Sequence, residues 1–327
     1  MKRRLVPPAL AVLLGLTVAA WSQAPRPEHG AQSAERVNPM ISLHERNLPV
    51  FGLYAPANRR GGRGAPPATG SETSMRLARE TLGYGASDYI FSGSMEGSVD
   101  RGLPAFTEYV SALRDAGATV RTHPIVVKTP NIADDPAGAI ENIGRQLNAG
   151  ASGIMFVGVE SAEEVRQGLA AMRFGSKGGR RSEDVGSAPA YWGMTESEYR
   201  QRADPWPLNP AGELISWTIV ESLEGLNNVR EIAAVEGIGV LWPGAGTLRR
   251  LFSVTGPDGR RVLDEEGWED AIQQVLAACK EFDVPCGYPA NANDIEQRIE
   301  QGFTVFVMGW GEGGFNAIDI GRRVSGR

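Results

Sequence analysis

Residues 212–248 read GELISWTIVESLEGLNNVREIAAVEGIGVLWPGAGTL, and this stretch shows most clearly how the chain folds. The apolar run at 215–220 predicts a buried strand, a segment with helical period follows at 226–235, and a second apolar run lies at 239–241. Two buried parallel strands need a crossover between them, which is usually a helix. The stretch therefore predicts one strand–helix–strand unit of a parallel sheet.

The same alternation continues in both directions along the chain. Further strands are expected at 50–55, 88–92, 119–127, 153–157, 284–287 and 304–309. Further helices are expected at 72–82, 103–116, 136–149, 162–172, 267–282, 294–301 and 316–324, with a short extra helix at 247–252. Eight strands alternating with eight helices predict an α/β fold with a single (β/α)8 TIM barrel. A doubly wound open sheet is the alternative, but no GxGxxG motif follows the first strand.

Helix-capping residues support these boundaries. Asp134 or Asp135 before Pro136 is an N-cap followed by a proline in the first turn, and Gly150 ends the same helix. Ser161 followed by Glu164 is a capping-box pattern.

The amino-terminal residues are typical of an export signal. Lys2, Arg3 and Arg4 precede an apolar run at 5–20 that ends in small residues, which predicts a secretory signal peptide over 1–20. An uncleaved anchor is the alternative, although the run is shorter than the ~20 residues of a spanning helix. We therefore expect a periplasmic or secreted protein with no stable membrane span after cleavage.

The rest of the chain divides into an arm and a barrel. Residues 21–47 are polar, without a sustained period, and are interpreted as an arm or linker before a barrel domain over 48–327. Two segments fall outside the barrel repeat. Residues 173–213 form a long insertion after the fourth helix, and residues 255–266 form a turn-rich insert around TGPDG. A long loop without regular structure inside a compact domain is more often functional than accidental.

Composition excludes several classes of protein. The 327 residues carry 33 Lys and Arg against 39 Asp and Glu, a formal net charge of −6, so nucleic acid is not an expected partner. The two cysteines, Cys279 and Cys286, cannot build a disulfide framework. Export would permit them to pair, but their apolar surroundings favour two buried free thiols.

Reactive groups of a TIM barrel lie at the carboxyl ends of its strands. At those positions the sequence has Glu96, Lys128, Glu160 and Glu221. Glu221 ends a fully apolar strand, so its carboxylate must be solvated, paired or bound to a metal ion. Lys128 is a candidate for holding an anionic substrate, or a surface lysine. The backbone amides of the loop after the sixth strand are candidates for binding a carboxylate or phosphate; this loop comprises Gly244, Ala245, Gly246 and Thr247.

Three stretches together resemble one known family. They are LNAGASGIMFVGVESAEEV at 147–165, the opening stretch at 212–248, and VLAACKEFDVPCG at 275–287 with a later QGF. In this order they resemble the HpcH/HpaI aldolase/citrate lyase family, which consists of class II pyruvate-dependent aldolases on a TIM barrel. The resemblance covers roughly residues 48–310, and Gly158 stands where the family has a proline.

The resemblance implies a divalent metal ion that polarises a pyruvate-like group as a Lewis acid. Carboxylate and water ligands suit Mg²⁺ or Mn²⁺. The family's metal-binding glutamate falls on Glu221, and its aspartate falls on Thr247 in GAGTL. A neutral hydroxyl is a poor replacement for that carboxylate, so weaker metal binding is expected.

Two further positions differ from the family pattern. Its active-site arginine falls on Lys128, which keeps the charge and loses the bidentate fork. Its acid/base histidine would fall within DYIFSGSMEGSVD at 88–100, which has no histidine and offers Glu96 as a candidate proton-transfer group. In the insertion, the family's arginine turn falls on Arg180 or Arg181. Arg181 either binds an acidic substrate as part of a gate, or belongs to a packing loop or subunit contact.

These observations lead to two hypotheses. The first is an aldolase-like carbon–carbon lyase that acts on a small oxo- or hydroxy-acid through a metal-stabilised pyruvate enolate. In it Glu221 binds the metal, Lys128 the substrate, and Glu96 transfers protons. The second is a catalytically degenerate exported barrel that binds a small acidic ligand or a protein partner. The resemblance also implies a homo-oligomer.

Overall fold

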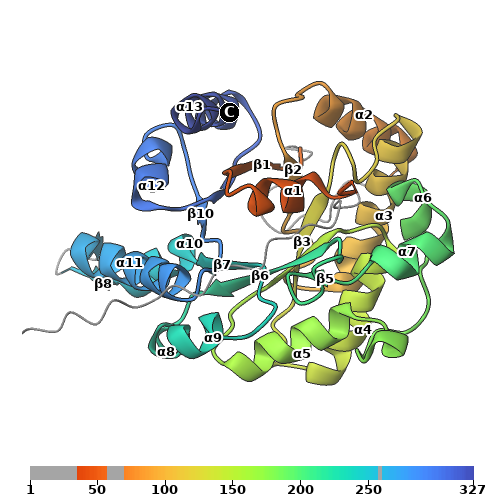
Figure 1. Cartoon of the computed structure of the whole chain (residues 1–327). Coiled ribbons are helices and arrows are strands. Elements are labelled where there is room, and N and C mark those ends of the chain that lie inside the picture. Colours follow the sequence, from red (N-terminus) through yellow and green to blue (C-terminus); the bar gives the residue numbers. More distant parts are fainter. Residues whose placement is uncertain (1–34, 57–69, 257–259) are drawn as a thin grey trace, which may run out of the picture. The chain divides into compact units, whose positions relative to one another are not determined.

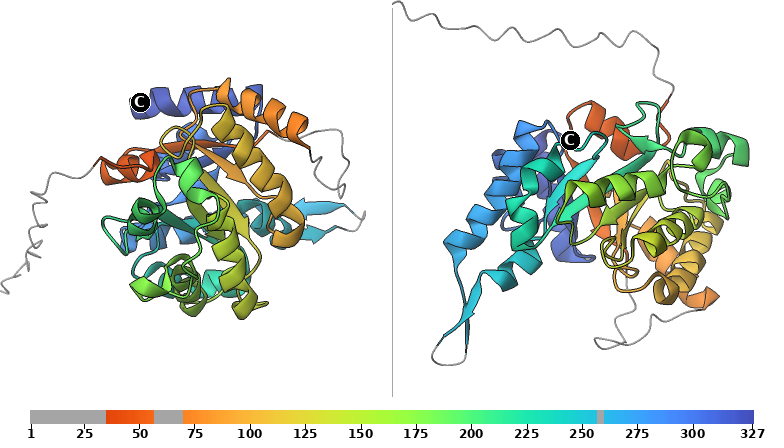
Figure 2. Two further views of the ribbon diagram at one scale, coloured as in Figure 1. Left: turned by 90° about the vertical axis from the view of Figure 1, so that its right-hand side faces the viewer. Right: turned by 90° about the horizontal axis from the view of Figure 1, so that it is seen from below.

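The computed structural model describes residues 35–56, 70–256 and 260–327, and the predicted signal peptide lies outside them. Residues 36–327 form one compact unit. Its strands are surrounded by helices (Figures 1 and 2). Within the described ranges, no helix has both the length and the apolar character needed to span a bilayer.

Eight parallel strands form a ring, as the sequence predicts. They are β1 (Val50–Tyr54), β2 (Tyr89–Ser92), β3 (Ile125–Thr129), β4 (Gly153–Phe156), β6 (Leu214–Val220), β7 (Val240–Pro243), β10 (Gly287–Pro289) and β11 (Val305–Met308). Neighbours pair in this order from β1 to β7, and β10 pairs with β11, which pairs with β1. A single bridge between Leu241 and Cys286 joins β7 to the start of β10 and closes the barrel.

Helices follow the strands. They are α2 (Ser71–Leu82), α3 (Val99–Asp115), α4 (Pro136–Asn148), α5 (Ala162–Met172), α8 (Leu223–Asn227), α9 (Val229–Ala233), α10 (Ala245–Leu251), α11 (Glu265–Glu281), α12 (Ile295–Gln301) and α13 (Glu312–Ser325). The predicted caps are confirmed: Asp135 accepts from Gly138 N at 2.9 Å, and Ser161 accepts from Glu164 N at 3.3 Å. These caps satisfy amide groups that the first helical turn leaves unpaired.

The barrel interior is filled by aromatic side chains. Trp217 and Trp242 stack with ring centroids 5.2 Å apart, and Tyr89 contacts Trp217 edge-on. Two strands carry glycine where these rings cross the barrel: a Cβ at Gly52 would overlap the Tyr89 ring, and one at Gly287 would overlap Trp242. The interior is therefore a packed core, which leaves the strand ends as the place for a site.

The described part of the predicted arm belongs to the barrel unit. It folds into α1 (Pro39–Glu45), whose Met40 and Leu43 are buried together with the interior side chains. Asn38 caps this helix, and the Glu213 carboxylate, just before β6, accepts from the backbone amides of Val37 and Asn38. Helix α1 therefore covers the end of the barrel where the strands begin.

The insertion at 173–213 packs against the same end. It contains a short 3-10 turn (Gly175–Lys177), α6 (Ala188–Trp192), α7 (Glu196–Arg202) and β5 (Pro205–Trp206). The Tyr191 hydroxyl donates to His123 O, and the Trp192 indole donates to Gly150 O, both just before barrel strands. The sequence left open whether this insertion is a gate over the substrate site or a packing loop or subunit contact. These contacts favour the packing loop.

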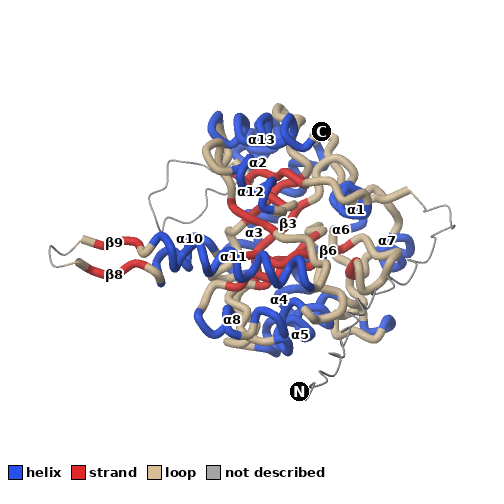
Figure 3. The backbone as a smooth tube through the Cα atoms, turned by 60° about the vertical axis from the view of Figure 1, so that its left-hand side comes forward, coloured by secondary structure: helices blue, strands red, loops and turns tan. Residues whose placement is uncertain are grey.

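The second insert forms an antiparallel hairpin of β8 (Ser253–Thr255) and β9 (Arg261–Leu263). Figure 3 shows it extending away from the barrel beyond α10 and α11. The TGPDG turn falls partly on residues 257–259, outside the described residues.

The interpretation of Cys279 and Cys286 as free thiols is wrong, because they form a disulfide in the structure. Helix α11 ends at Glu281, and Asp283 then takes a left-handed conformation with φ +54°. This turn sends the chain back along the helix, so that the two cysteine Cα atoms lie 5.7 Å apart. Such a separation is normal for a disulfide. Sequence patterns alone did not reveal this reversal.

Candidate active site at the carboxyl ends of the strands

The ion pair between Lys128 and Glu96 is the centre of the candidate site. Lys128 lies in β3, one residue before its end, and Glu96 lies in the turn after β2. Lys128 Nζ donates to Glu96 Oε1 at 2.9 Å, with the lysine side chain 14% exposed and the glutamate side chain 45% exposed. The structure therefore brings together two residues that the sequence places at strand ends.

Packing below the surface holds the backbone that carries each partner. Met95 is fully buried and anchors the turn that presents Glu96 to solvent. The Gln146 side chain of α4 donates to Lys128 O at 2.8 Å, which holds the backbone of the lysine. The carboxylate can move in solvent while the ammonium group remains largely enclosed.

Glu221 follows β6 and is held by the loops after β4 and β7, the two strands that flank β6 in the ring. Its Oε1 accepts from Gly158 N at 3.2 Å, and a Cβ at Gly244 would overlap Glu221 Cβ. Gly158 has φ +59°, and its carbonyl accepts from Asn131 Nδ2 at 3.1 Å. The ends of β3, β4, β6 and β7 are thus linked around one half-buried carboxylate.

The loop Gly244–Thr247 closes over the end of β6 and opens helix α10. Gly244 N donates to Val220 O, so this amide is already used. Ala245 is buried and Gly246 is exposed. Thr247 Oγ1 accepts from the Arg250 guanidinium at 3.1 Å. These contacts leave fewer free amides for an anion than the sequence alone suggests.

The residues around Glu221 do not fit a metal site built on two carboxylates. Thr247 stands at the second ligand position, and its hydroxyl receives a hydrogen bond from a cationic guanidinium. Across the described residues, no three His, Cys, Asp or Glu side chains are grouped as metal ligands. We therefore derive no chemical step through a metal ion.

Arg181 lies at the opposite end of the barrel, so the structure contradicts its assignment to substrate binding. It is 1% exposed, its guanidinium lies 4.3 Å from the centre of the Phe174 ring, and it donates to Asn148 and Tyr199. Asn148 ends α4, and that end leads into the start of β4. The sequence could not reveal this placement, because nothing in GGRR shows toward which end of the barrel the insertion folds.

The described histidines are also distant from the strand ends. His123 precedes β3, and His44 lies on α1 with its ring stacked on Trp206 at 5.7 Å. Burial lowers the pKa of His44 to about 4. Neither replaces the acid/base histidine that the resemblance implies. His29 lies outside the described residues.

Tyr54 is a site residue that sequence analysis missed. It ends β1 and packs edge-on against Phe91, with ring centroids 4.9 Å apart. Burial raises the pKa of its phenol, Lys128 lowers it, and Glu96 raises it. Counting alternate residues along β1 from Val50 would have placed Tyr54 on the inward face.

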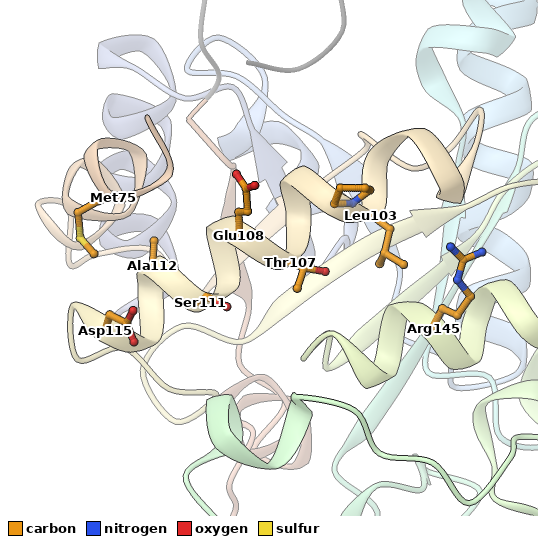
Figure 4. A pocket seen from close by; sticks show the side chains of 9 residues that line it. Met75, Leu103, Thr107, Glu108, Ser111, Ala112, Asp115 and Arg145 are labelled. Atoms are coloured by element: carbon orange, nitrogen blue, oxygen red, sulfur yellow. The ribbon is translucent and has the colours of Figure 1, made fainter. Parts of the chain in front are cut away.

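Several cavities of the described residues lie away from this ion pair, among them one of about 580 Å³ at the first turns of α2. Two others bear on the site. One of about 470 Å³ lies on the outer helices, lined by residues of α2, α3 and α4 such as Met75, Leu103 and Arg145 (Figure 4). The other, of about 340 Å³, is formed by the ends of β10 and β11 and the start of α13, with Gly309 and Trp310 in its wall. The cavity beside Gly309 lies at the barrel end that carries Lys128.

Known proteins agree with the fold and with the family that the sequence resembles. The profile of the family described as HpcH/HpaI aldolase/citrate lyase matches residues 105–316. The chain is 26% identical over 241 residues to 2-dehydro-3,6-dideoxy-6-sulfogluconate aldolase of Pseudomonas putida, which covers 73% of this chain and 84% of the relative. It is also 26% identical over 275 residues to hydroxypyruvate/pyruvate aldolase of Paraburkholderia phytofirmans, covering 83% of this chain and 90% of the relative.

Solved structures show the same architecture. A family protein from Burkholderia cenocepacia superposes with a TM-score of 0.58 at 22% identity, covering 82% of this chain and 92% of that one. Macrophomate synthase superposes with a TM-score of 0.54 at 18% identity, covering 92% and 93%. At these identities the likeness establishes the fold alone.

Proposed function

Because the chain belongs to the HpcH/HpaI aldolase/citrate lyase family, we propose that it is a carbon–carbon lyase acting on a small oxo- or hydroxy-acid. The observation that carries the proposal is the Lys128–Glu96 ion pair at the carboxyl ends of the strands. Relatives named as aldolases support the reaction class.

The ion pair supplies a cation for the substrate and a base for the reaction. An anionic oxygen of the substrate competes with Glu96 for the Lys128 ammonium group, and its binding frees the Glu96 carboxylate. Lys128 then lies where negative charge develops on the oxygen of the oxo group. Such preorganised charge is commonly the largest contribution to catalysis.

For a 4-hydroxy-2-oxo acid the step is a retro-aldol cleavage. Glu96 takes the proton of the 4-hydroxyl, the bond between C3 and C4 breaks, and an aldehyde leaves. The electron pair passes to the oxygen at C2 as an enolate, whose charge faces Lys128. The proton returned to C3 completes a pyruvate-type product, so the reaction needs no oxidant or reductant.

Two steady-state assays test the proposal on the chain from residue 21: decarboxylation of oxaloacetate, and release of pyruvate from a 4-hydroxy-2-oxo acid. Each is run with EDTA, Mg²⁺ or Mn²⁺, which tests whether turnover depends on a metal ion. Lys128→Met should lower kcat/KM by about 100-fold or more. Lys280→Met, on the exposed face of α11, should leave it within about twofold. Equal rates for wild type and Lys128→Met would exclude this role of the ion pair.

One alternative is a degenerate barrel that only binds an acidic ligand. It is favoured because the described histidines lie away from the strand ends and Thr247 replaces the second carboxylate. Under that alternative, wild type has no turnover in any assay while oxalate still binds. Isothermal titration with oxalate therefore separates the two functions. Turnover that depends on Lys128 would exclude the degenerate barrel.

A further inference from the structure

Tyr54 differs from the rest of its strand in exposure. The four residues before it in β1 are buried, whereas Tyr54 is 41% exposed. Its ring still packs on Phe91, so the side chain is supported on one side and open on the other. A tyrosine held in this way presents its hydroxyl at a fixed place.

Gly93 brings Tyr54 and Lys128 together. It follows β2, between β1 and β3 in the ring, and a Cβ there would lie 3.8 Å from Lys128 Cδ and 4.0 Å from Tyr54 Cε1. The two side chains therefore flank the same glycine. Burial is the largest effect on the Tyr54 hydroxyl and raises its pKa, so the phenol stays protonated at neutral pH and can donate a hydrogen bond.

The 340 Å³ cavity lies on the other side of Tyr54. Leu53 pairs with Met308 in the β1–β11 register, which places Tyr54 beside Gly309. Gly309 lines the cavity, and a Cβ there would meet nothing within 4 Å. Tyr54 is thus located between the ion pair and open space large enough for a few heavy atoms of substrate.

We propose that Tyr54 contacts the substrate, donating a hydrogen bond to an oxygen of the oxo-acid held by Lys128, while the rest of the substrate extends past Gly309 into the cavity. The inference rests on the proposed function. Glu312 lies in the cavity wall, and its carboxylate disfavours a second anionic end on the substrate. The substrate class is therefore a monocarboxylic 2-oxo acid with an uncharged tail.

Tyr54→Phe tests the hydroxyl, because the phenylalanine ring keeps the contact with Phe91. We expect kcat/KM and the affinity for oxalate to fall by about tenfold or more, with the unfolding midpoint unchanged. Tyr191→Phe is the matched control. It removes the hydrogen bond to His123 O at the other end of the barrel, so stability should fall while oxalate binding and kinetics stay the same.

Gly309→Val tests the path of the tail. Added methyl groups have space there, so the protein should fold. KM should rise for a 4-hydroxy-2-oxo acid with a long uncharged tail but not for one with a short tail.

The outcomes separate this inference from the proposed function. Active wild type with unchanged Tyr54→Phe would overturn the role of Tyr54 and leave the lyase intact. Wild type without turnover and without oxalate binding would overturn both. An equal effect of Gly309→Val on all substrates would exclude the cavity as the place of the tail.

Discussion

Glycines determine the position of Glu221. Gly158 donates its amide to the carboxylate, and Gly244 packs against the side chain so closely that no Cβ fits. The position of the Glu221 carboxylate therefore depends on two neighbouring residues that have no side chain.

Gly244→Ala should therefore displace Glu221. We expect a loss of about 1–3 kcal/mol in unfolding free energy, typical of overpacking, together with a lower kcat/KM. Gly246→Ala, in the same loop, is the control, because a Cβ there meets nothing within 4 Å. It should be neutral or stabilise helix α10 by up to about 1 kcal/mol. Urea denaturation and steady-state kinetics measure both, and equal behaviour of the two variants would contradict this account.

Strand-end counting predicted Lys128, Glu96 and Glu221 as site residues, because a parallel barrel gathers its strand ends at one rim. The resemblance suggested Arg181 as well, but nothing in the sequence of the 41-residue insertion shows toward which end of the barrel it folds. Tyr54 carries no charge and so does not stand out among the strand ends, although alternation along β1 places it on the inward face.

Helix α1, which covers the end of the barrel where the strands begin, carries a titratable group, His44. Its His44 is buried and stacked on Trp206, which belongs to the insertion at the same end of the barrel. Burial holds the pKa of His44 at about 4, against 6.5 in the unfolded chain. The unfolded state therefore binds the proton first, and stability falls as the pH decreases from 6.5 toward 4.

This linkage predicts that wild type loses about 2 kcal/mol of unfolding free energy between pH 7.5 and 5 through His44 alone. His44→Phe keeps an aromatic ring against Trp206 and cannot titrate. Between pH 7.5 and 5 this variant should therefore lose about 2 kcal/mol less unfolding free energy than wild type. Urea denaturation at both pH values measures the difference. The same pH dependence in both proteins would show that His44 does not titrate as its burial implies.

The Cys279–Cys286 disulfide stabilises the junction of α11 and β10. Closing so short a loop should contribute about 2–3 kcal/mol to the unfolding free energy. Reduction with TCEP should lower the stability of wild type by that amount and leave a Cys279→Ala, Cys286→Ala variant unaffected. Quantitative alkylation of native, unreduced protein would contradict the pairing.

Most element boundaries were predictable because apolar runs and caps are local signals. Two strands are displaced from their predicted ranges. The third, expected at 119–127, lies at Ile125–Thr129, because residues 119–123 form a turn. The seventh, expected at 284–287, lies at Gly287–Pro289, since Pro285 and Cys286 approach β7 only at one bridge. Helix α1 and the disulfide depend on contacts between distant segments, which no local pattern contains.

At the scale of the whole molecule, the barrel depends on α1 as its base. A chain that begins at Leu48 lacks this helix and exposes the side chains that Met40 and Leu43 cover. We expect it to lose about 3 kcal/mol or more relative to a chain that begins at Glu35, since each buried apolar side chain contributes about 1.5–3 kcal/mol. Thermal unfolding of the two chains measures this, and equal midpoints would show that the barrel does not need α1. Export and cleavage concern residues outside the described part and stay predictions.

The single bridge between β7 and β10 makes the ring unequal around its circumference. Most neighbouring strands share three or four registered residue pairs, whereas this joint has Leu241–Cys286 alone, with the disulfide beside it. The pairing of β7 with β10 is the weakest in the ring, so local opening of the barrel should begin between these two strands. Because the disulfide ties the start of β10 to helix α11, its reduction removes a covalent restraint from the β10 side of this joint.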